Sequence, residues 1–194
     1  MSGARVAAAT LAAVLAAAPL HASSSPPLPY RLAVEVRWGA GGGPEAFRDD
    51  VARALADAFT GRCYAAASAG ADDPSAPADL HLAVSLSALK EQLRFLDSIS
   101  TSLAPGDPAK ELRRTALFDV NVDGALTTAG AAPVQAKHFV VSVSRQPTML
   151  GEDPQITART FAVERIVDEL GKAMCKGQDK LDKKIKAALT QPAR

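Results

Sequence analysis

Few side chains in this sequence have types and spacing that could carry out chemistry. Beyond the N-terminal segment the histidines are His81 and His138, and both lie in segments where apolar and polar residues alternate. Two histidines hold a metal ion only together with further ligands, and no third ligand is spaced to join them. The serines do not occupy the Gly-x-Ser-x-Gly motif that positions a nucleophile. We therefore expect no catalytic residue, no metal site and no cofactor.

One short motif could bind a ligand. Asp119, Asn121 and Asp123 alternate with valines and precede Gly124, and this stretch resembles the start of an EF-hand calcium loop. Such a loop ends in a glutamate that binds calcium with both oxygens, but Gly130 stands at that position. The same residues fit a β-strand with its valines in the core and its polar side chains in water. A calcium-dependent binding module is thus one alternative.

The two cysteines, Cys63 and Cys175, follow two stretches of helical pattern. Cys63 lies 19 residues after Pro44, and Cys175 lies 21 residues after Pro154. At ~1.5 Å per residue, each cysteine is roughly 30 Å along its helix, so adjacent parallel helices would bring the sulfurs together. In an exported chain we expect them to form one disulfide. The alternative is two separate buried thiols.

The N-terminus has the pattern of a secretory signal over residues 1–22. Arg5 precedes an apolar run, residues 6–20, that is too short for the ~20 residues of a membrane span. Residues 23–29 look like an extended lead-in. We expect a periplasmic or secreted protein, with an uncleaved anchor as the alternative. The 22 basic and 21 acidic residues nearly balance, which argues against a nucleic-acid partner.

Alternating apolar residues predict four strands, at residues 31–38, 80–87, 115–128 and 135–145. Residues 88–112 could continue the second strand as an arm or form a helix, and the strand is favoured. Its apolar residues exceed what a small sheet needs, and they are the predicted partner-binding residues: Leu93, Phe95, Leu96 and Ile99.

Two amphipathic helices are predicted, one after Pro44 and one from Asp153 to Gly177. Asp153 can cap the second helix, and Gly177 can end it. The expected fold is a two-layer α+β sandwich, residues 30–177, in the order β-α-β-β-β-α, with a four-stranded, mostly antiparallel sheet and both helices on one face. Residues 178–194 form a basic amphipathic tail, which either packs weakly on the domain or touches an anionic membrane.

The order of elements resembles small periplasmic accessory domains of the bacterial cell envelope, namely subunits of lipopolysaccharide assembly and the N-terminal module of the Tol-system propeller protein. The resemblance is one of architecture over residues 30–176, and no motif carries it. The leading hypothesis is a non-catalytic exported domain that binds a protein or another envelope component. The surplus apolar residues make the sheet edges or the arm the expected contact surface. The alternative is an enzyme of unrecognised type on the polar sheet face, which carries His81, Asp119, Asn121, Asp123 and His138.

Overall fold

The computed structural model describes residues 26–70, 77–95, 114–128 and 133–190. Their elements are, in chain order, β1 (Leu28–Trp38), α1 (Glu45–Phe59), β2 (Tyr64–Ala69), β3 (Leu80–Phe95), β4 (Arg114–Thr128), β5 (Gln135–Arg145), α3 (Pro154–Cys175) and α4 (Gln178–Leu189). The α+β class is confirmed. Within the described residues, however, the sheet has five strands and the helices number three, so the predicted four strands and two helices were wrong.

The sheet has the strand order β2-β1-β3-β4-β5. Strand β1 pairs in parallel with both β2 and β3, whereas β3–β4 and β4–β5 are antiparallel. The sheet is therefore mixed and not mostly antiparallel. Strand β2 was missed because its sequence is chiefly alanine, without the alternation that marks a strand. Its extended form depends on pairing with β1, which begins at Leu28, inside the predicted lead-in.

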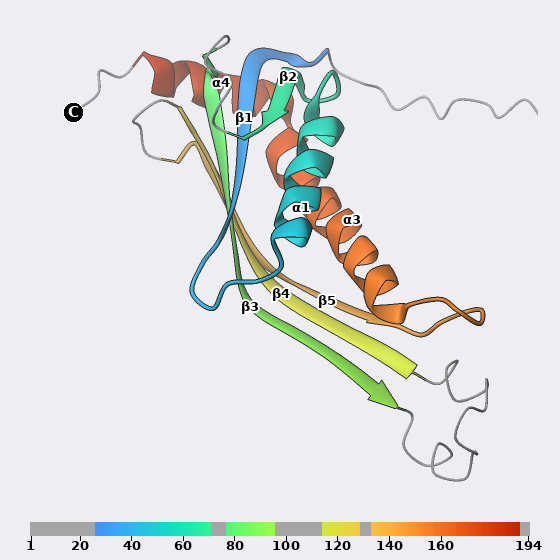
Figure 1. The fold of residues 1–194 in the computed structure, drawn as a ribbon. Coiled ribbons are helices and arrows are strands. Elements are labelled where there is room, and N and C mark those ends of the chain that lie inside the picture. The colour runs from blue at the N-terminus through green and yellow to red at the C-terminus, as the bar shows by residue number, and fades with distance from the viewer. Residues whose placement is uncertain (1–25, 71–76, 96–113, 129–132, 191–194) are drawn as a thin grey trace, which may run out of the picture.

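Helices α1 and α3 lie side by side on one face of the sheet, as predicted (Figure 1). The Asp153 carboxylate caps α3 by accepting a hydrogen bond from the Gln155 backbone N–H at 2.8 Å. Gly177 ends this part of the chain with a left-handed φ of 70°, which glycine adopts without a steric cost.

Helix α4 crosses near the end of the sheet and is part of the packed domain (Figure 1). Leu181 and Ile185 are buried in the core, and the Tyr30 hydroxyl on β1 donates to the Asp182 carboxylate at 2.8 Å. Two of the three residues of the tail's apolar stripe are thus used inside the domain, whereas Leu189 is exposed. This favours the packed form of the tail over one that inserts the stripe into a membrane.

The core lies between the helices and one face of the sheet. On β4, Phe118, Val120, Val122 and Leu126 point to this face and are buried. Between them, Gly124 lies directly under α3: a Cβ at this position would stand 2.6 Å from Leu170 Cδ2. The glycine therefore allows α3 to approach the middle of the sheet.

The structure contains the Cys63–Cys175 disulfide, which joins residues 112 apart in sequence with a Cα–Cα distance of 5.4 Å. It connects the C-terminal ends of the two parallel helices. Cys63 lies in a turn beyond the end of α1 at Phe59, and the Cys63 backbone N–H donates to the Phe59 carbonyl at 3.1 Å. The pairing was predicted correctly, although the helix is shorter than expected.

Strand β3 continues well beyond its neighbour β1, which confirms the strand form of the predicted arm as far as Phe95. Between Ser87 and Lys90 one extra residue enters the strand, and Ala88 takes a left-handed φ of 52°. The bulge reverses which face the odd-numbered residues occupy. Beyond it Leu93 points to the helix side, because its partner on β4 is the buried Ala116. The rest of the arm lies outside the described residues.

Candidate functional site

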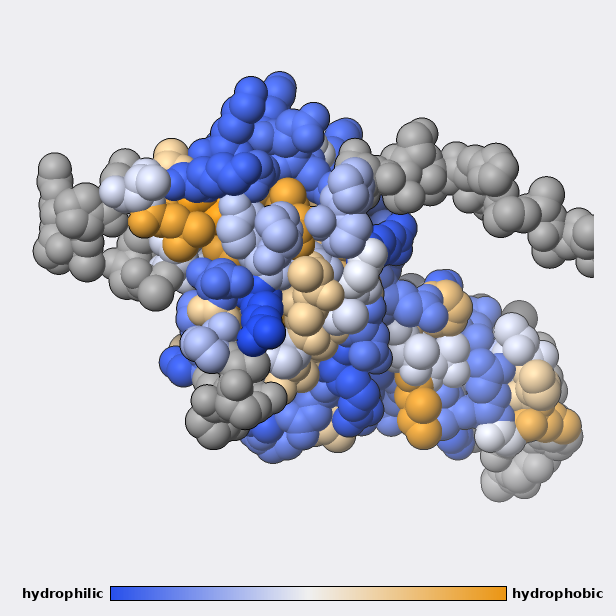
Figure 2. Space-filling model, turned by 90° about the horizontal axis from the view of Figure 1, so that it is seen from above, coloured by the Kyte–Doolittle hydropathy of each residue, from blue (hydrophilic) through white to orange (hydrophobic). Residues whose placement is uncertain are grey.

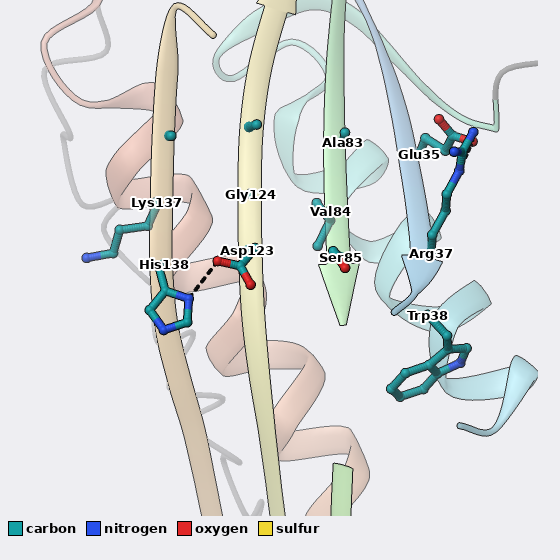
Figure 3. A pocket seen from close by; sticks show the side chains of 12 residues that line it. Glu35, Arg37, Trp38, Ala83, Val84, Ser85, Asp123, Gly124, Lys137 and His138 are labelled. Atoms are coloured by element: carbon teal, nitrogen blue, oxygen red, sulfur yellow. Dashed lines mark hydrogen bonds and ion pairs between the residues drawn. The ribbon is translucent and has the colours of Figure 1, made fainter. Parts of the chain in front are cut away.

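The face of the sheet opposite the helices carries a row of polar side chains from four strands. Arg37 on β1 is in register with Ser85 on β3, Ser85 with Asp123 on β4, and Asp123 with His138 on β5. His138 Nδ1 and the Asp123 carboxylate are 2.6 Å apart (Figure 3). Strand pairing thus gathers four polar groups that are up to a hundred residues apart in the sequence.

A hollow of about 620 Å³ lies along this row. Its floor is low because three residues of the next row are alanines. These are Ala83, Ala125 and Ala136, which continue the row that begins with Glu35 on β1. Glu35 and Arg37 form an ion pair on one side, and the Asp123–His138 pair lies on the other (Figure 3). The hollow is open, since the Asp123 and His138 side chains keep 55% and 64% of their surface exposed.

The order of these side chains does not support nucleophilic catalysis. In a serine triad the histidine stands between serine and carboxylate, because it must take the proton from the hydroxyl. Here Asp123 stands between Ser85 and His138, so the imidazole is placed beyond the carboxylate. Asp123 and His138 serve as hydrogen-bonding groups on a solvent-exposed surface.

The other residues of the predicted enzyme site do not join the hollow. His81 pairs with Thr127, and Asp119 pairs with Ser142, so they lie at separate points of the face. Sequence reasoning named Asp123 and His138 but missed Glu35, Arg37 and Ser85. All three occupy polar positions of alternating strands, yet which strands become neighbours is not visible in the alternation.

The residues of the calcium motif lie in continuous strand. Asp119, Asn121 and Asp123 are paired on both sides, with β3 and with β5. At ~3.4 Å per residue, their side chains are spread over roughly 13 Å instead of surrounding one point. Within the described residues, no group of three or more histidine, cysteine, aspartate or glutamate side chains could hold a metal ion. The motif therefore has the strand geometry that was its alternative interpretation.

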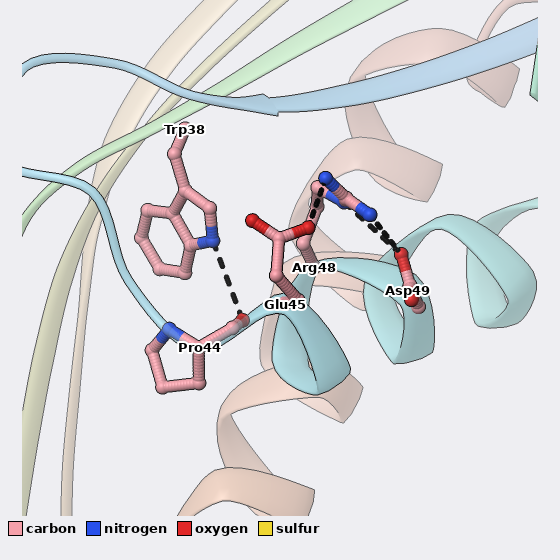
Figure 4. Close-up of polar contacts among 5 residues, drawn as sticks. All are labelled: Trp38, Pro44, Glu45, Arg48 and Asp49. Atoms are coloured by element: carbon pink, nitrogen blue, oxygen red, sulfur yellow. Dashed lines mark hydrogen bonds and ion pairs between the residues drawn. The ribbon is translucent and has the colours of Figure 1, made fainter.

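The turn after β1 fixes one wall of the hollow. The Trp38 indole N–H donates to the Pro44 carbonyl at 3.3 Å, and Arg48 pairs with Glu45 and Asp49 at the start of α1 (Figure 4). The hydrogen bond from Arg48 to Asp49 raises the pKa of the guanidinium. These contacts fix the glycine-rich loop, residues 39–43, which connects β1 with α1, and so they fix the position of Trp38.

The projecting part of β3 is the second candidate surface. Trp38 is the last β1 residue in register with β3, opposite Leu86, and among the described residues no strand pairs with this side of β3 further along. Leu93 is 38% exposed, and Phe95 ends the strand opposite Arg114. The predicted binding residues Leu96 and Ile99 lie outside the described residues.

An ion pair attaches this arm to the helix layer. The Arg159 guanidinium on α3 donates from Nε and Nη2 to the two carboxylate oxygens of Glu91, at 3.0 and 2.8 Å. The hydrogen bonds that Arg159 donates to Glu91 raise the pKa of the guanidinium. Two parallel bonds of this kind fix an orientation as well as a distance. The arm is therefore held in place while its outer edge stays accessible.

Helix α4 presents charge to the outside. Figure 2 views the molecule from above, toward the end where α4 lies, and shows strongly hydrophilic surface beside smaller hydrophobic patches. Lys180, Lys183 and Lys184 of α4 are exposed. Over the part of the chain that the structure describes, no helix is long and apolar enough to cross a bilayer.

Comparison with known proteins gives similarity at the level of architecture. No family model and no curated protein matches the sequence. Among solved structures, the hypothetical protein CT253 from Chlamydia trachomatis has a TM-score of 0.43 and 11% identity over 76% of this chain and 98% of that chain. A minor lipoprotein from Acinetobacter baumannii gives 0.36 and 13%, over 86% and 100% of the two chains. Rare lipoprotein B from Shewanella oneidensis gives 0.29 and 13%, over 81% and 94%.

Two of these three names describe lipoproteins. A specific family, whether of lipopolysaccharide assembly or of the Tol system, is not shown. Because the identities are below 25% and the TM-scores below 0.5, these likenesses carry no functional argument. The function has to be argued from the surfaces described above.

Proposed function

We propose that this protein is a non-catalytic, exported binding domain that holds an extended segment of an envelope protein against the free edge of β3. The observation that carries the proposal is the length of β3 beyond β1. From Ser87 to Phe95 the strand is paired on its β4 side, while the described residues provide no strand for its other side. Such an edge offers a row of backbone donors and acceptors to a partner strand.

Side chains next to this edge add specificity. Leu89 and Leu93 lie on the helix side of the arm with Glu91 between them, so an added strand would find two apolar side chains beside this edge. The Glu91–Arg159 ion pair holds the arm before the partner arrives. A preorganised edge reduces the ordering that binding would otherwise require.

A pull-down from envelope extract tests the proposal. The full chain serves as bait in envelope extract, alongside Leu93→Ser and the control Val140→Ser. Val140 on β5 is also an apolar strand residue and is 57% exposed, but its side chain lies on the sheet face away from the helices. A partner recovered by the native chain and by Val140→Ser, but reduced with Leu93→Ser, is the expected result.

Hydrogen exchange then identifies the mode of binding. The partner should protect backbone amides of residues 87–95 because an added strand takes up their hydrogen-bonding groups. Unchanged exchange at these amides in the complex, or equal recovery with both variants, would reject strand addition.

A second contact is proposed for α4, as a weak electrostatic one with an anionic membrane. Its support is the arrangement of the helix, in which Leu181 and Ile185 are buried while Lys180, Lys183 and Lys184 face outward. Binding to anionic vesicles should disappear as salt is raised, because only surface charge is involved. Salt-independent binding would contradict this contact.

A further inference from the structure

Arg145, the last residue of β5, has an unusual environment. It is in register with the buried Ala116 of β4, so its side chain lies on the helix side of the sheet. There the guanidinium stacks on the ring of Phe161 from α3, 3.6 Å from the ring centroid. Stacking of this kind fixes the plane of the guanidinium and therefore the directions of its N–H groups.

The charge of Arg145 has no acidic partner among the described residues. Its one hydrogen bond is a long contact of 3.5 Å from Nη1 to the Ser144 carbonyl. Within the described part of the chain, the Nε atom is buried and has no hydrogen-bond partner. By contrast, Arg37, Arg48 and Arg159 each reach a carboxylate. Arginine keeps its charge at any physiological pH, so a fixed, half-buried and unpaired guanidinium points to a missing anion.

A cavity of about 660 Å³ adjoins this guanidinium. Ser144, Thr148 and Thr157 supply hydroxyl groups to its lining, and Glu152 supplies a carboxylate. Glu152 is already bonded: one oxygen accepts from Thr148 N and Oγ1 at 2.7 and 2.9 Å, and the other from Thr157 Oγ1 at 3.0 Å. These bonds lower the pKa of Glu152, led by that from the Thr148 backbone. Its negative charge disfavours a doubly charged ligand.

Two exposed apolar side chains lie in the turn between Thr148 and Glu152, which both line the cavity. Met149 and Leu150 are 68% and 56% exposed, and they occupy the turn that Gly151 completes with a left-handed φ of 84°. The Glu152 backbone N–H donates to the Met149 carbonyl at 3.3 Å, which closes the turn. Adjacent exposed hydrophobic residues next to an anion-binding group suit a ligand with one charged and one apolar part.

We propose that Arg145, stacked on Phe161, binds the singly charged phosphodiester group of a lipid, with Met149 and Leu150 against its apolar part. The guanidinium presents a planar pair of donors that matches two phosphate oxygens. A diester carries one negative charge, which the neighbouring Glu152 tolerates better than the two charges of a phosphate monoester. This site lies on β5, which β4 separates from β3, and it does not depend on strand addition.

Titration of the full chain with dimethyl phosphate tests the anion site, followed by NMR at the backbone amides of Ser144 and Gln146, which line the cavity and are retained in every variant. We expect a saturable shift, absent in Arg145→Gln and weakened about fivefold or more in Arg145→Lys, which keeps the charge but loses the fork. Phe161→Leu should also weaken binding, because Arg145 keeps its charge but loses the ring on which it stacks. The control Arg37→Gln removes an exposed, ion-paired guanidinium and should bind like the native chain. Equal binding by Arg145→Gln and the native chain would overturn the proposal.

A soluble short-chain phosphatidylglycerol tests the lipid assignment. It should bind about tenfold more tightly than dimethyl phosphate, through burial of its apolar part. Replacing Met149 and Leu150 together by serine should remove this advantage without changing the affinity for dimethyl phosphate. Equal affinity of the native chain for the two ligands would refute a lipid ligand.

Discussion

Adding one methyl group at Gly124 should destabilise this protein, although alanine is favoured over glycine in most regular structure. A Cβ at this position would lie 2.6 Å from Leu170 Cδ2, about 1 Å closer than two carbon atoms normally approach. Leu170 is 0% exposed, so its methyl group has no free space into which to move. Either α3 shifts away from β4 or Leu170 leaves its rotamer.

The expected cost follows from these contacts. Overpacking of a closed core costs about 1–3 kcal/mol. The lower backbone entropy of alanine in the unfolded chain returns about 0.5 kcal/mol. Gly124→Ala should therefore lose about 0.5–2.5 kcal/mol, which for a domain of this size lowers Tm by about 1–10 °C.

Gly171 in α3 provides the matched control. A Cβ there would lie 3.9 Å from Phe59 Cε1, which is an ordinary contact. Because alanine is the better helix former, Gly171→Ala should gain about 0.5–1 kcal/mol and raise Tm by about 1–4 °C. The same substitution in the same domain is thus expected to act in opposite directions at the two sites.

Thermal and urea unfolding of the two variants measure the difference. Leu170→Ala should also cost less in the Gly124→Ala background than in the native chain, because the new methyl takes part of the vacated space. If Gly124→Ala raises Tm as Gly171→Ala does, the close approach of α3 to β4 is not the reason for this glycine.

Three further outcomes are expected. Reducing the disulfide, which joins residues 112 apart, should cost about 5 kcal/mol on the loop-entropy model, measured by urea unfolding with and without reductant; an unchanged midpoint would contradict it. Burial and the bond to Asp182 raise the pKa of Tyr30 to about 12, whereas an unfolded tyrosine ionises near ~10. Stability from this group is therefore complete below about pH 10 and lost toward about pH 12, so the deficit of Tyr30→Phe in thermal melts should shrink over that range; a constant deficit would argue against the assignment. Glu91→Gln should cost about 1 kcal/mol and speed hydrogen exchange along β3 beyond Ser87, because Arg159 loses a charged partner; unaltered exchange would show that the ion pair does not hold the arm.

Alternation and caps were sufficient to predict most elements. The four predicted strands and both predicted helices are present, and Asp153 and Gly177 act as the expected helix boundaries. These features are local: a period of two or 3.6 residues and a capping side chain are set by a few neighbours. Strand β2 was not predicted because a run of small residues has no such period. Its strand form depends on pairing with β1.

The candidate sites depended on contacts that no local pattern contains. Asp123 and His138 meet because β4 and β5 are neighbours in that register, and Arg37 joins their row because β1 pairs with β3. The role of Arg145 could not be predicted, because in the sequence it is an ordinary arginine at the end of a strand. Its position under Phe161 follows from the packing of α3 on β5.

By itself, the sequence determined the class of fold, the cysteine pair and the polar character of the open sheet face. Strand alternation and helical period are set within short stretches of chain, and two cysteines in an exported chain can pair only with each other. The tertiary structure decided the strand order, the free edge of β3 and the surroundings of Arg145. Each of these depends on which distant segments pack together, and that choice is made by burial over the whole chain at once.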